Sequence, residues 1–292
     1  MDRSSAAHDH RVAVVIATRD RAGDLDVALR HLTSLPERPH IVVVDNASTD
    51  STVALVRRNH PTVEVVALEH NRWGGARSIG AARAGAPYVA FSDDDSWWGP
   101  GSLARAADLL DAHPRLGLVA GRVLVGSERR LDPTCVAMSE TPLPQNGDLS
   151  SPAILGFLAC GAVVRRETFL GLGGFDHRFE IGGEEELFAL DLASAGWGLH
   201  YADDVVAHHH PSTMRDASSR RRRQMRNLLW SAWLRRPPRS ALARSGFVLR
   251  RAMRDPMAAR ALIDAVRGLP WVVKDRRLIH PELAAALARL EA

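Results

Sequence analysis

Three consecutive carboxylates, Asp93, Asp94 and Asp95, directly follow the short apolar run at residues 88–92. Adjacent carboxylates repel one another unless a cation lies among them, and hard divalent cations prefer oxygen ligands. A nucleotide diphosphate bridged by Mg²⁺ or Mn²⁺ would balance this charge. The alternative is a solvated acidic turn that caps a helix. The triplet is therefore the first candidate for metal-assisted chemistry.

A second candidate is the segment Asn71–Arg77, which combines two glycines with one arginine. Gly74 and Gly75 allow a ligand to approach the backbone closely, and the Arg77 guanidinium can donate paired hydrogen bonds to phosphate oxygens. The Gly-Gly spacing differs from the Gly-x-Gly-x-x-Gly fingerprint of dinucleotide-binding enzymes, which argues against a nicotinamide cofactor. The alternative is a surface turn that begins a helix.

The elements that position these residues are predicted by four short apolar runs rich in β-branched residues, at 11–17, 41–44, 63–68 and 88–92. Segments with helical spacing separate them. This alternation predicts an α/β fold with an open, mostly parallel sheet and helices on both faces.

In such a sheet, ligands bind beyond the carboxyl ends of the strands. Thr18 and Arg21 follow the first predicted strand, Asp45 follows the second, and the acidic triplet follows the fourth. We therefore expect these side chains to meet on one edge of the sheet.

The charge of the chain is divided along its length. Of the 292 residues, 46% are hydrophobic and 25% charged, which is typical of a globular protein, and the net charge is +4. Arginines concentrate after residue 215, whereas carboxylates dominate before it. We predict a first domain at residues 1–214 and a basic helical C-terminal appendage at 215–292. A basic segment favours an anionic partner, such as a membrane surface or a polyanion.

The cysteine content, the polar first residues and the length of the apolar runs predict the cellular location. Cys135 and Cys160 are too few for a disulfide framework. Met1–Ser5 is polar, and no run reaches the ~20 apolar residues that a membrane span requires. We expect a cytoplasmic protein.

Taken together, these segments resemble the family 2 glycosyltransferases of the GT-A fold, rhamnosyltransferases among them. The resemblance covers residues 11–212 and depends on the order of several segments. These are Val14–Arg21, Val43–Asp50, Asn71–Arg77, Phe91–Asp95, Gly173–Asp176 and Gly183–Glu186. The resemblance implies a GT-A-like sheet and a metal-dependent enzyme. Such an enzyme transfers a sugar from a nucleoside-diphosphate donor to an acceptor hydroxyl, with inversion at the anomeric carbon.

The resemblance also implies roles for residues around the nucleotide. Asp45 would hydrogen-bond the base, because a carboxylate accepts from an imide N–H, and Thr18 and Arg21 would line the base and ribose pocket. The alternative for Asp45 is an Asx turn with Ala47 or Ser48.

For the donor sugar, the resemblance implies that Asp93 contacts the ribose or the sugar and that Asp95 binds Mn²⁺ or Mg²⁺. Asp93 is a further candidate metal ligand, and Asp94 lies within the same donor site. Arg77 is the candidate contact of the donor diphosphate or ribose.

Activation of the acceptor is implied for an acidic pair, here Glu184 and Glu185, whose second member would be the general base. A carboxylate within hydrogen-bond reach can take the proton of the attacking hydroxyl. Related enzymes usually have Asp at this second position, and Glu186 follows directly, so the assignment among the three glutamates stays open. The alternative is that they only favour the first turn of the helix Leu187–Ala195.

Two histidines complete the predicted metal site. His208 and His210 follow the short predicted strand at 205–207, and strand alternation directs them to one face and His209 to the other. By resemblance a histidine here approaches the metal or the diphosphate, and imidazole is a suitable Mn²⁺ ligand. A structural or surface role is the alternative for each.

The appendage contains the arginine run Arg220–Arg223, followed by an amphipathic helix with Trp230 and Trp233. Basic helices with tryptophans suit a membrane interface, where a lipid-linked acceptor would lie. Packing against the first domain is the alternative. No nucleic-acid motif accompanies the run, so we expect no nucleic-acid partner. The acceptor would be a glycan, a lipid-linked sugar or a small molecule.

Two other functions compete with sugar transfer. A sugar-phosphate nucleotidyltransferase would need a glycine-rich loop with a lysine near the first strand, whereas Lys274 is the only lysine of the chain. A scaffold that binds sugar nucleotides without turnover would keep the same binding residues.

Overall fold

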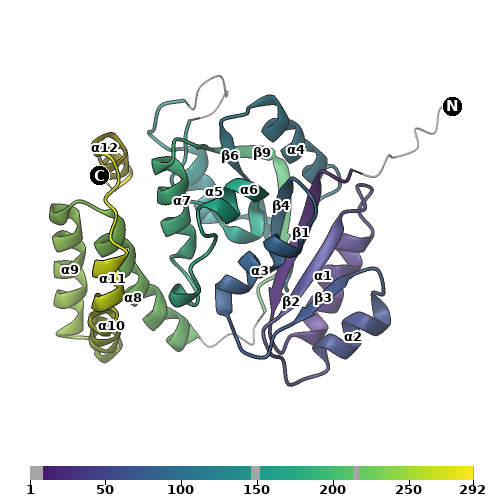
Figure 1. The fold of residues 1–292 in the computed structure, drawn as a ribbon, viewed down its shortest axis with the longest axis horizontal. Coiled ribbons are helices and arrows are strands. Elements are labelled where there is room, and N and C mark those ends of the chain that lie inside the picture. The colour runs from purple at the N-terminus through teal and green to yellow at the C-terminus, as the bar shows by residue number, and fades with distance from the viewer. Residues whose placement is uncertain (1–8, 146–151, 213–216, 292) are drawn as a thin grey trace.

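The computed structural model describes residues 9–145, 152–212 and 217–291. Figure 1 shows an α/β body with a group of C-terminal helices packed at one end. The polar segment Met1–Ser5 and the predicted boundary between residues 214 and 215 lie outside the described residues. That boundary stays a prediction.

The first half of the sheet is parallel, as the alternating pattern predicts. Strand β1 pairs with β2 and β4, and β2 pairs with β3. The register aligns Thr18 with Asp45 and Ala17 with Asp93, so the polar residues at the strand ends share one edge. The four strands are β1 (Val12–Thr18), β2 (His40–Asp45), β3 (Glu64–Ala67) and β4 (Tyr88–Asp93).

The second half of the sheet is mixed. Strand β8 lies between β4 and β6 and runs antiparallel to both, whereas β6 and β9 are parallel. Strand β5 pairs antiparallel with β9 and places Ser96 opposite His209, so the end of β9 lies beside the acidic triplet. The strands are β5 (Ser96–Trp98), β6 (Leu116–Val125), β7 (Arg130–Leu131), β8 (Ala162–Arg165) and β9 (Gly198–His209).

Helices cover the sheet and bury one face each. In α1, the buried Leu25, Leu29 and Leu32 recur at helical spacing and join the main core. The predicted α/β sheet flanked by helices is thus confirmed. The helices of this part are α1 (Ala22–Thr33), α2 (Thr52–Asn59), α3 (Ala76–Arg83), α4 (Ser102–Ala112), α5 (Pro133–Ser139), α6 (Arg166–Gly171) and α7 (Glu184–Ser194). Short 3-10 turns occur at Trp73–Gly75, Ala159–Gly161 and His177–Phe179.

Gly80 lets α3 pack closely on the sheet. A Cβ at this position would lie 2.4 Å from Val15 Cγ1 and 3.0 Å from Val44 Cγ2. We expect Gly80→Ala to lower the free energy of unfolding by about 1–3 kcal/mol, because overpacking outweighs the gain in helix propensity. Gly23→Ala in α1 is the control, since its Cβ would meet nothing within 4 Å. Urea unfolding compares the two, and equal stabilities would contradict this packing.

The C-terminal helices are joined to the body by a second hydrophobic cluster. Phe179 and Leu187 of the body pack with Leu229, Trp230 and Leu234 of α8. The predicted C-terminal helices are thus present, and they share a core with the body. They are α8 (Ala217–Arg235), α9 (Pro238–Ala252), α10 (Pro256–Arg267), α11 (Leu269–Lys274) and α12 (Pro281–Leu290). Among the described residues, none of the helices combines the length and the apolar character needed to cross a bilayer.

Candidate active site

A cleft of about 580 Å³ opens at the carboxyl ends of β1 and β4 and is closed on its far side by the loop before α7 and the start of α8. Seven of the predicted site residues line it: Thr18, Arg21, Arg77, Asp93, Asp94, Glu184 and Glu185. The cleft therefore combines the acidic turn after β4 with the acidic start of α7, although these segments are far apart in the sequence.

The acidic turn is held by hydrogen bonds from three directions. Ser96 Oγ accepts from the Asp93 backbone N–H at 2.7 Å, and Thr18 Oγ1 donates to Asp94 Oδ2 at 3.0 Å. Asp95 Oδ2 accepts from the Ser212 backbone N–H at 3.0 Å. Burial raises the pKa of Asp94 to about 7, and the neighbouring carboxylates of Asp93 and Asp95 add to the shift. This concentration of negative charge is what a cation would relieve.

A histidine joins the turn from the end of β9. One ligand-type atom from each of Asp93, Asp95 and His209 lies within 4.8 Å of the other two, and His209 Nε2 is 3.3 Å from Asp95 Oδ1. Two carboxylates and an imidazole form a donor set that suits Mn²⁺. The residues present therefore fit a divalent cation. Among the described residues, Asp93, Asp95 and His209 are the group of acidic and imidazole side chains found close enough together to hold a metal ion.

The predicted histidine ligands, His208 and His210, lie elsewhere. Their rings pack on Trp97, with centroid distances of 5.8 Å and 4.7 Å. His208 pairs directly with Trp97 across β5 and β9, so the two side chains share the face of the sheet that also holds His31. The alternation was predicted correctly, but the face that meets the carboxylates carries His209.

Arg77 lies between the two acidic groups of the cleft. Its guanidinium forms an ion pair with Asp93, and its buried Nε has no hydrogen-bond partner among the described residues. Burial lowers the pKa of Arg77, but the charges of Asp93, Glu184 and Glu185 outweigh this and raise it above its usual value. Arg77 is therefore a fixed cation with a donor that a ligand oxygen could satisfy.

The three glutamates of α7 have separate environments. Glu184 is 2% exposed, and burial together with the charge of Glu185 raises its pKa well above the usual range, although Arg77 opposes the shift. This buried environment favours the protonated form of Glu184. Glu185 is half-buried and lines the cleft. Glu186 points to the C-terminal helices, where it pairs with Arg236 at 2.6 Å.

The glycines after Asn71 connect the donor side of the cleft to α7. The Gly74 backbone N–H donates to the Glu180 carbonyl at 2.8 Å. A Cβ on Gly74 would lie 3.0 Å from Glu184 Oε1, and one on Gly75 would lie 2.7 Å from His177 Cβ. The two glycines therefore serve close packing against the acidic segment.

Asp45 is placed differently from the expectation for a base contact. It is 2% exposed, it is not among the residues that line the cleft, and both of its carboxylate oxygens accept hydrogen bonds from Ser48, whose backbone N–H lies at 3.0 Å. This is the Asx turn considered as the alternative. Its neighbour Asn46 lines the cleft instead, with Oδ1 accepting from the Arg72 backbone N–H at 2.9 Å.

The sequence reasoning missed several residues of the cleft. Asn46, Trp73, Asp132, Glu180 and Arg223 line it, and His209 completes the metal-type cluster. Trp73 and Glu180 adopt positive φ angles of 52° and 62°, which bulky side chains rarely do. No local pattern reveals these positions, because they depend on how the loops fold over the sheet.

Solved structures share this architecture. The mannosyltransferase PcManGT from Pyrobaculum calidifontis, in complex with GDP-Man and Mn²⁺, aligns with a TM-score of 0.58 and 21% identity, covering 98% of this chain and 87% of that chain. TarS from S. aureus aligns with a TM-score of 0.58 and 20% identity, covering 77% of this chain and 40% of that chain. Together with the sheet and its cleft, these alignments define the GT-A fold.

Comparisons of the sequence with known proteins define the family. N-acetylglucosaminyl-diphospho-decaprenol L-rhamnosyltransferase of Mycobacterium tuberculosis is 27% identical over 239 residues, which cover 70% of this chain and 78% of that protein. Succinoglycan biosynthesis protein ExoO of Rhizobium meliloti is 30% identical over 172 residues, covering 53% and 48%. The model of glycosyl transferase family 2 matches residues 13–171, more than half of the chain. This protein belongs to glycosyl transferase family 2.

Proposed function

We propose that this glycosyltransferase uses a divalent metal at Asp93, Asp95 and His209 to move a sugar from a nucleoside-diphosphate donor to the hydroxyl of a lipid-linked acceptor. The observation that carries the proposal is that Asp93 and His209 of this cluster line the same cleft as the Glu184–Glu185 pair, with Asp95 buried directly behind them. The acceptor class is suggested by the mycobacterial relative, whose name specifies a diphospho-decaprenol acceptor and L-rhamnose. L-Rhamnose is therefore the first donor sugar to test.

In the proposed reaction, the acceptor oxygen attacks the anomeric carbon, the bond from that carbon to the diphosphate oxygen breaks, and Glu185 receives the hydroxyl proton. Glu185 is suited to this role because it is half-buried and lines the cleft, whereas Glu184 is 2% exposed and burial raises its pKa, which favours its protonated form. A single displacement inverts the anomeric configuration. A bound divalent metal supplies Lewis-acid stabilisation to the departing diphosphate.

For the donor nucleotide, we assign Thr18 and Arg21 to the base and ribose pocket and Arg77 to the diphosphate. Thr18 and Arg21 line the cleft beside the acidic turn, and Arg21 also hydrogen-bonds Ser212 Oγ at 2.5 Å. Asp45 keeps its proposed contact with the base only if a ligand displaces its hydrogen bonds to Ser48. Asn46 lines the cleft and is therefore better placed than Asp45 to contact the base.

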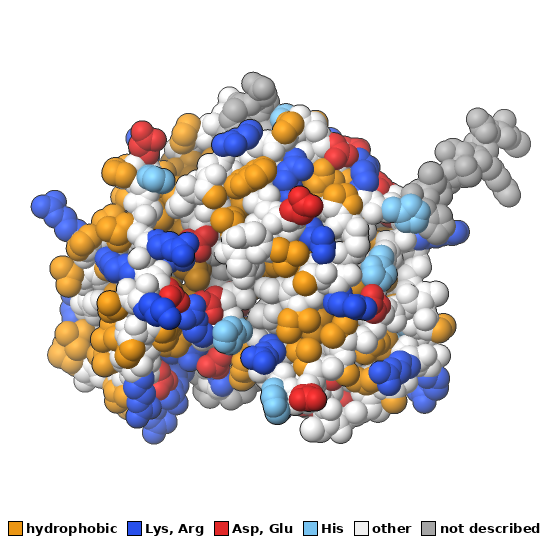
Figure 2. All heavy atoms as spheres, in the orientation of Figure 1, with side chains coloured by type: hydrophobic (Ala, Val, Ile, Leu, Met, Phe, Trp, Pro, Cys, Tyr) orange, Lys and Arg blue, Asp and Glu red, His pale blue; other side chains and the backbone are white. Residues whose placement is uncertain are grey.

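The C-terminal helices are proposed to rest on the inner face of the cell membrane, with the protein otherwise in the cytoplasm. Leu242 on α9, Met253 directly after α9 and Val273 on α11 are 71%, 73% and 69% exposed. Figure 2 shows hydrophobic and cationic side chains intermingled over these helices. Such a surface suits an anionic bilayer, where a lipid-linked acceptor resides.

The function is tested by screening a panel of sugar nucleotides with Mn²⁺, first by thermal unfolding and then by transfer assay. A true donor at about 100 times its Kd stabilises the fold by about 2.7 kcal/mol, which is a rise in Tm of about 4 °C for a chain of this length. We expect one donor to do so and to be consumed when a polyprenyl-diphosphate-linked sugar is present. Stabilisation without consumption would instead indicate a binding scaffold.

A further inference from the structure

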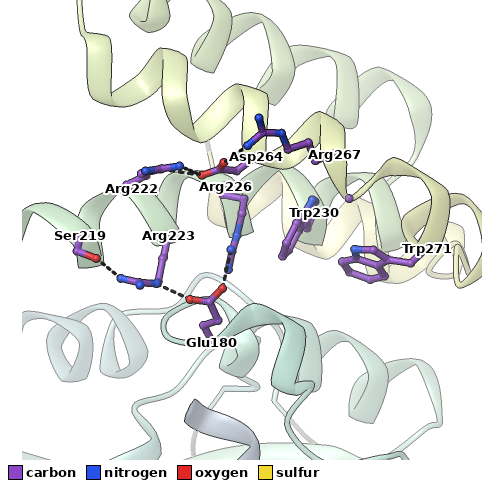
Figure 3. A pocket seen from close by; sticks show the side chains of 10 residues that line it. Glu180, Ser219, Arg222, Arg223, Arg226, Trp230, Asp264, Arg267 and Trp271 are labelled. Carbon is purple, nitrogen blue, oxygen red and sulfur yellow. Dashed lines mark hydrogen bonds and ion pairs between the residues drawn. The ribbon is translucent and has the colours of Figure 1, made fainter. Parts of the chain in front are cut away.

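A second cavity, of about 500 Å³, lies between the loop before α7 and the helices α8, α10 and α11 (Figure 3). We call it the arginine pocket. Its walls are formed chiefly by four arginines and two tryptophans: Arg222, Arg223, Arg226, Arg267, Trp230 and Trp271. None of the predicted site residues belongs to it.

The charges within the arginine pocket do not balance. Two carboxylates, Glu180 and Asp264, face the four guanidinium groups. Arg223 and Arg226 both pair with Glu180, the second at 2.9 Å, and Arg222 and Arg267 both pair with Asp264, at 2.6 Å and 3.6 Å. Each acid is thus shared by two arginines, which leaves two positive charges for an anionic ligand.

The arginines differ in how firmly they are held. Arg226 donates to the Phe179 carbonyl at 3.0 Å as well as to Glu180, so it supports the loop before α7. The side chains of Arg222 and Arg267 are 40% and 76% exposed and reach the pocket from α8 and α10. These two can reorient to place their planar donors on phosphate oxygens.

The two tryptophans of the arginine pocket are held in place by a hydrogen bond and by close packing. Trp230 Nε1 donates to the Ala265 carbonyl at 3.0 Å, and the Trp230 and Trp271 rings meet edge to face with centroids 5.0 Å apart. Gly268 joins α10 to α11 against this ring, and a Cβ there would lie 2.6 Å from Trp230. Aromatic walls provide apolar area beside the charged groups, as a ligand with both phosphate and carbon groups requires.

The arginine pocket adjoins the catalytic cleft. Glu180, Ser219 and Arg223 line both cavities. This shared wall is formed by the loop before α7, the helix that carries Glu185, and by the start of α8. A ligand in the pocket would therefore adjoin the cleft that Glu185 lines, as an acceptor must.

We propose that the arginine pocket binds the phosphate or diphosphate group of the acceptor, with Arg222 and Arg267 as the residues that contact it. This inference rests on the proposed function, since it places a phosphorylated acceptor beside the cleft. The pocket would hold the charged group while the acceptor sugar reaches Glu185. The exposed apolar residues of α9 to α11 lie on the neighbouring helices, where a lipid portion could remain in the membrane.

The test measures binding of inorganic pyrophosphate to the full chain by calorimetry in EDTA, so that no metal recruits it to the catalytic cleft. We expect the double variant Arg222→Gln/Arg267→Gln to raise the Kd at least tenfold, because each guanidinium contributes a charged hydrogen bond. Arg267→Gln alone, at a largely exposed position that folding does not require, should raise it several-fold. Arg260→Gln, an exposed arginine on the same helix outside the pocket, is the matched control and should leave the Kd unchanged.

Three outcomes would overturn the proposal. One is a Kd that the double variant leaves unchanged, and another is binding lost in Arg77→Gln instead, which would place pyrophosphate in the catalytic cleft. The third is a double variant that loses only its sedimentation with phosphatidylglycerol vesicles, which would assign the arginines to lipid headgroups. Failure of the wild-type protein to consume any sugar nucleotide would count against the proposed function while leaving the pyrophosphate result intact.

Discussion

Glu185→Gln is expected to lower kcat for sugar transfer by about 10²- to 10⁴-fold, the range that general base catalysis contributes. Glutamine keeps the size and the hydrogen bonding of the side chain but cannot take the proton of the acceptor. Glu185 lines the cleft and is not fully buried, so the substitution should not affect folding. The KM for the donor should change little, because Glu185 acts on the acceptor side.

Two neighbouring glutamates provide matched controls for this result. Glu186→Gln makes the same chemical change one residue along, where the carboxylate pairs with Arg236 outside the cleft, so kcat should stay within a few-fold of wild type. Glu184→Gln should have a smaller effect than Glu185→Gln, because burial raises the pKa of Glu184 and so disfavours the carboxylate form that a general base needs. A larger loss in Glu184→Gln than in Glu185→Gln would move the base to Glu184.

Asp95→Asn is expected to reduce metal-dependent transfer by about 10³-fold. A Lewis-acid metal contributes several kcal/mol to the transition state, and each 1.36 kcal/mol is a factor of ten in rate. Asparagine can still accept the hydrogen bond from the Ser212 N–H, so the loop at the end of β9 should keep its position. The assay compares initial rates at saturating Mn²⁺.

Asp204→Asn serves as the matched control, since this carboxylate is half exposed and pairs with Arg105 at 2.6 Å, away from the cleft. Its rate should equal that of the wild type. Full activity in Asp95→Asn, or activity in EDTA equal to that with Mn²⁺, would show that no metal acts at this position.

Much of the fold could be predicted because three of the four early strands contain a continuous apolar run. Residues buried on both faces of a parallel sheet need no alternation, so the runs at β1, β2 and β4 are unmistakable. Strand β6 was not predicted, since Gly117 and Gly121 interrupt its apolar pattern. Both glycines are required by packing, because a Cβ would lie 2.8 Å from Leu192 Cδ1 in the first case and 2.5 Å from the Val205 carbonyl oxygen in the second.

The candidate site was only partly predictable. Residues at the carboxyl end of a strand, such as Thr18 and Asp93, were placed in the cleft by the topology of a parallel sheet. The choice between His209 and its neighbours could not be made from alternation, which separates the two faces but does not say which one meets the acidic turn. That depends on the pairing of β5 with β9, which no local pattern reveals.

The C-terminal helices were predicted from charge, but their contacts with the body were not. The Glu180 carboxylate forms ion pairs with Arg223 and Arg226 of α8, and its backbone carbonyl accepts a hydrogen bond from the Gly74 N–H. The arginine run interpreted as a membrane-binding feature therefore also organises the loop before the general base. Side-chain charge alone could not distinguish these roles, because both place arginines beside acidic or anionic groups.

The central claim is that Asp93, Asp95 and His209 hold one divalent cation, and Mn²⁺ titration followed by electron paramagnetic resonance tests it most directly. Wild-type protein should bind one Mn²⁺ per chain in the presence of donor nucleotide. His209→Ala should raise the Kd for Mn²⁺ at least tenfold, whereas His208→Ala, which removes the ring packed on Trp97, should leave it within about twofold. Equal affinities in the two variants, or a stronger loss in His208→Ala, would contradict the account.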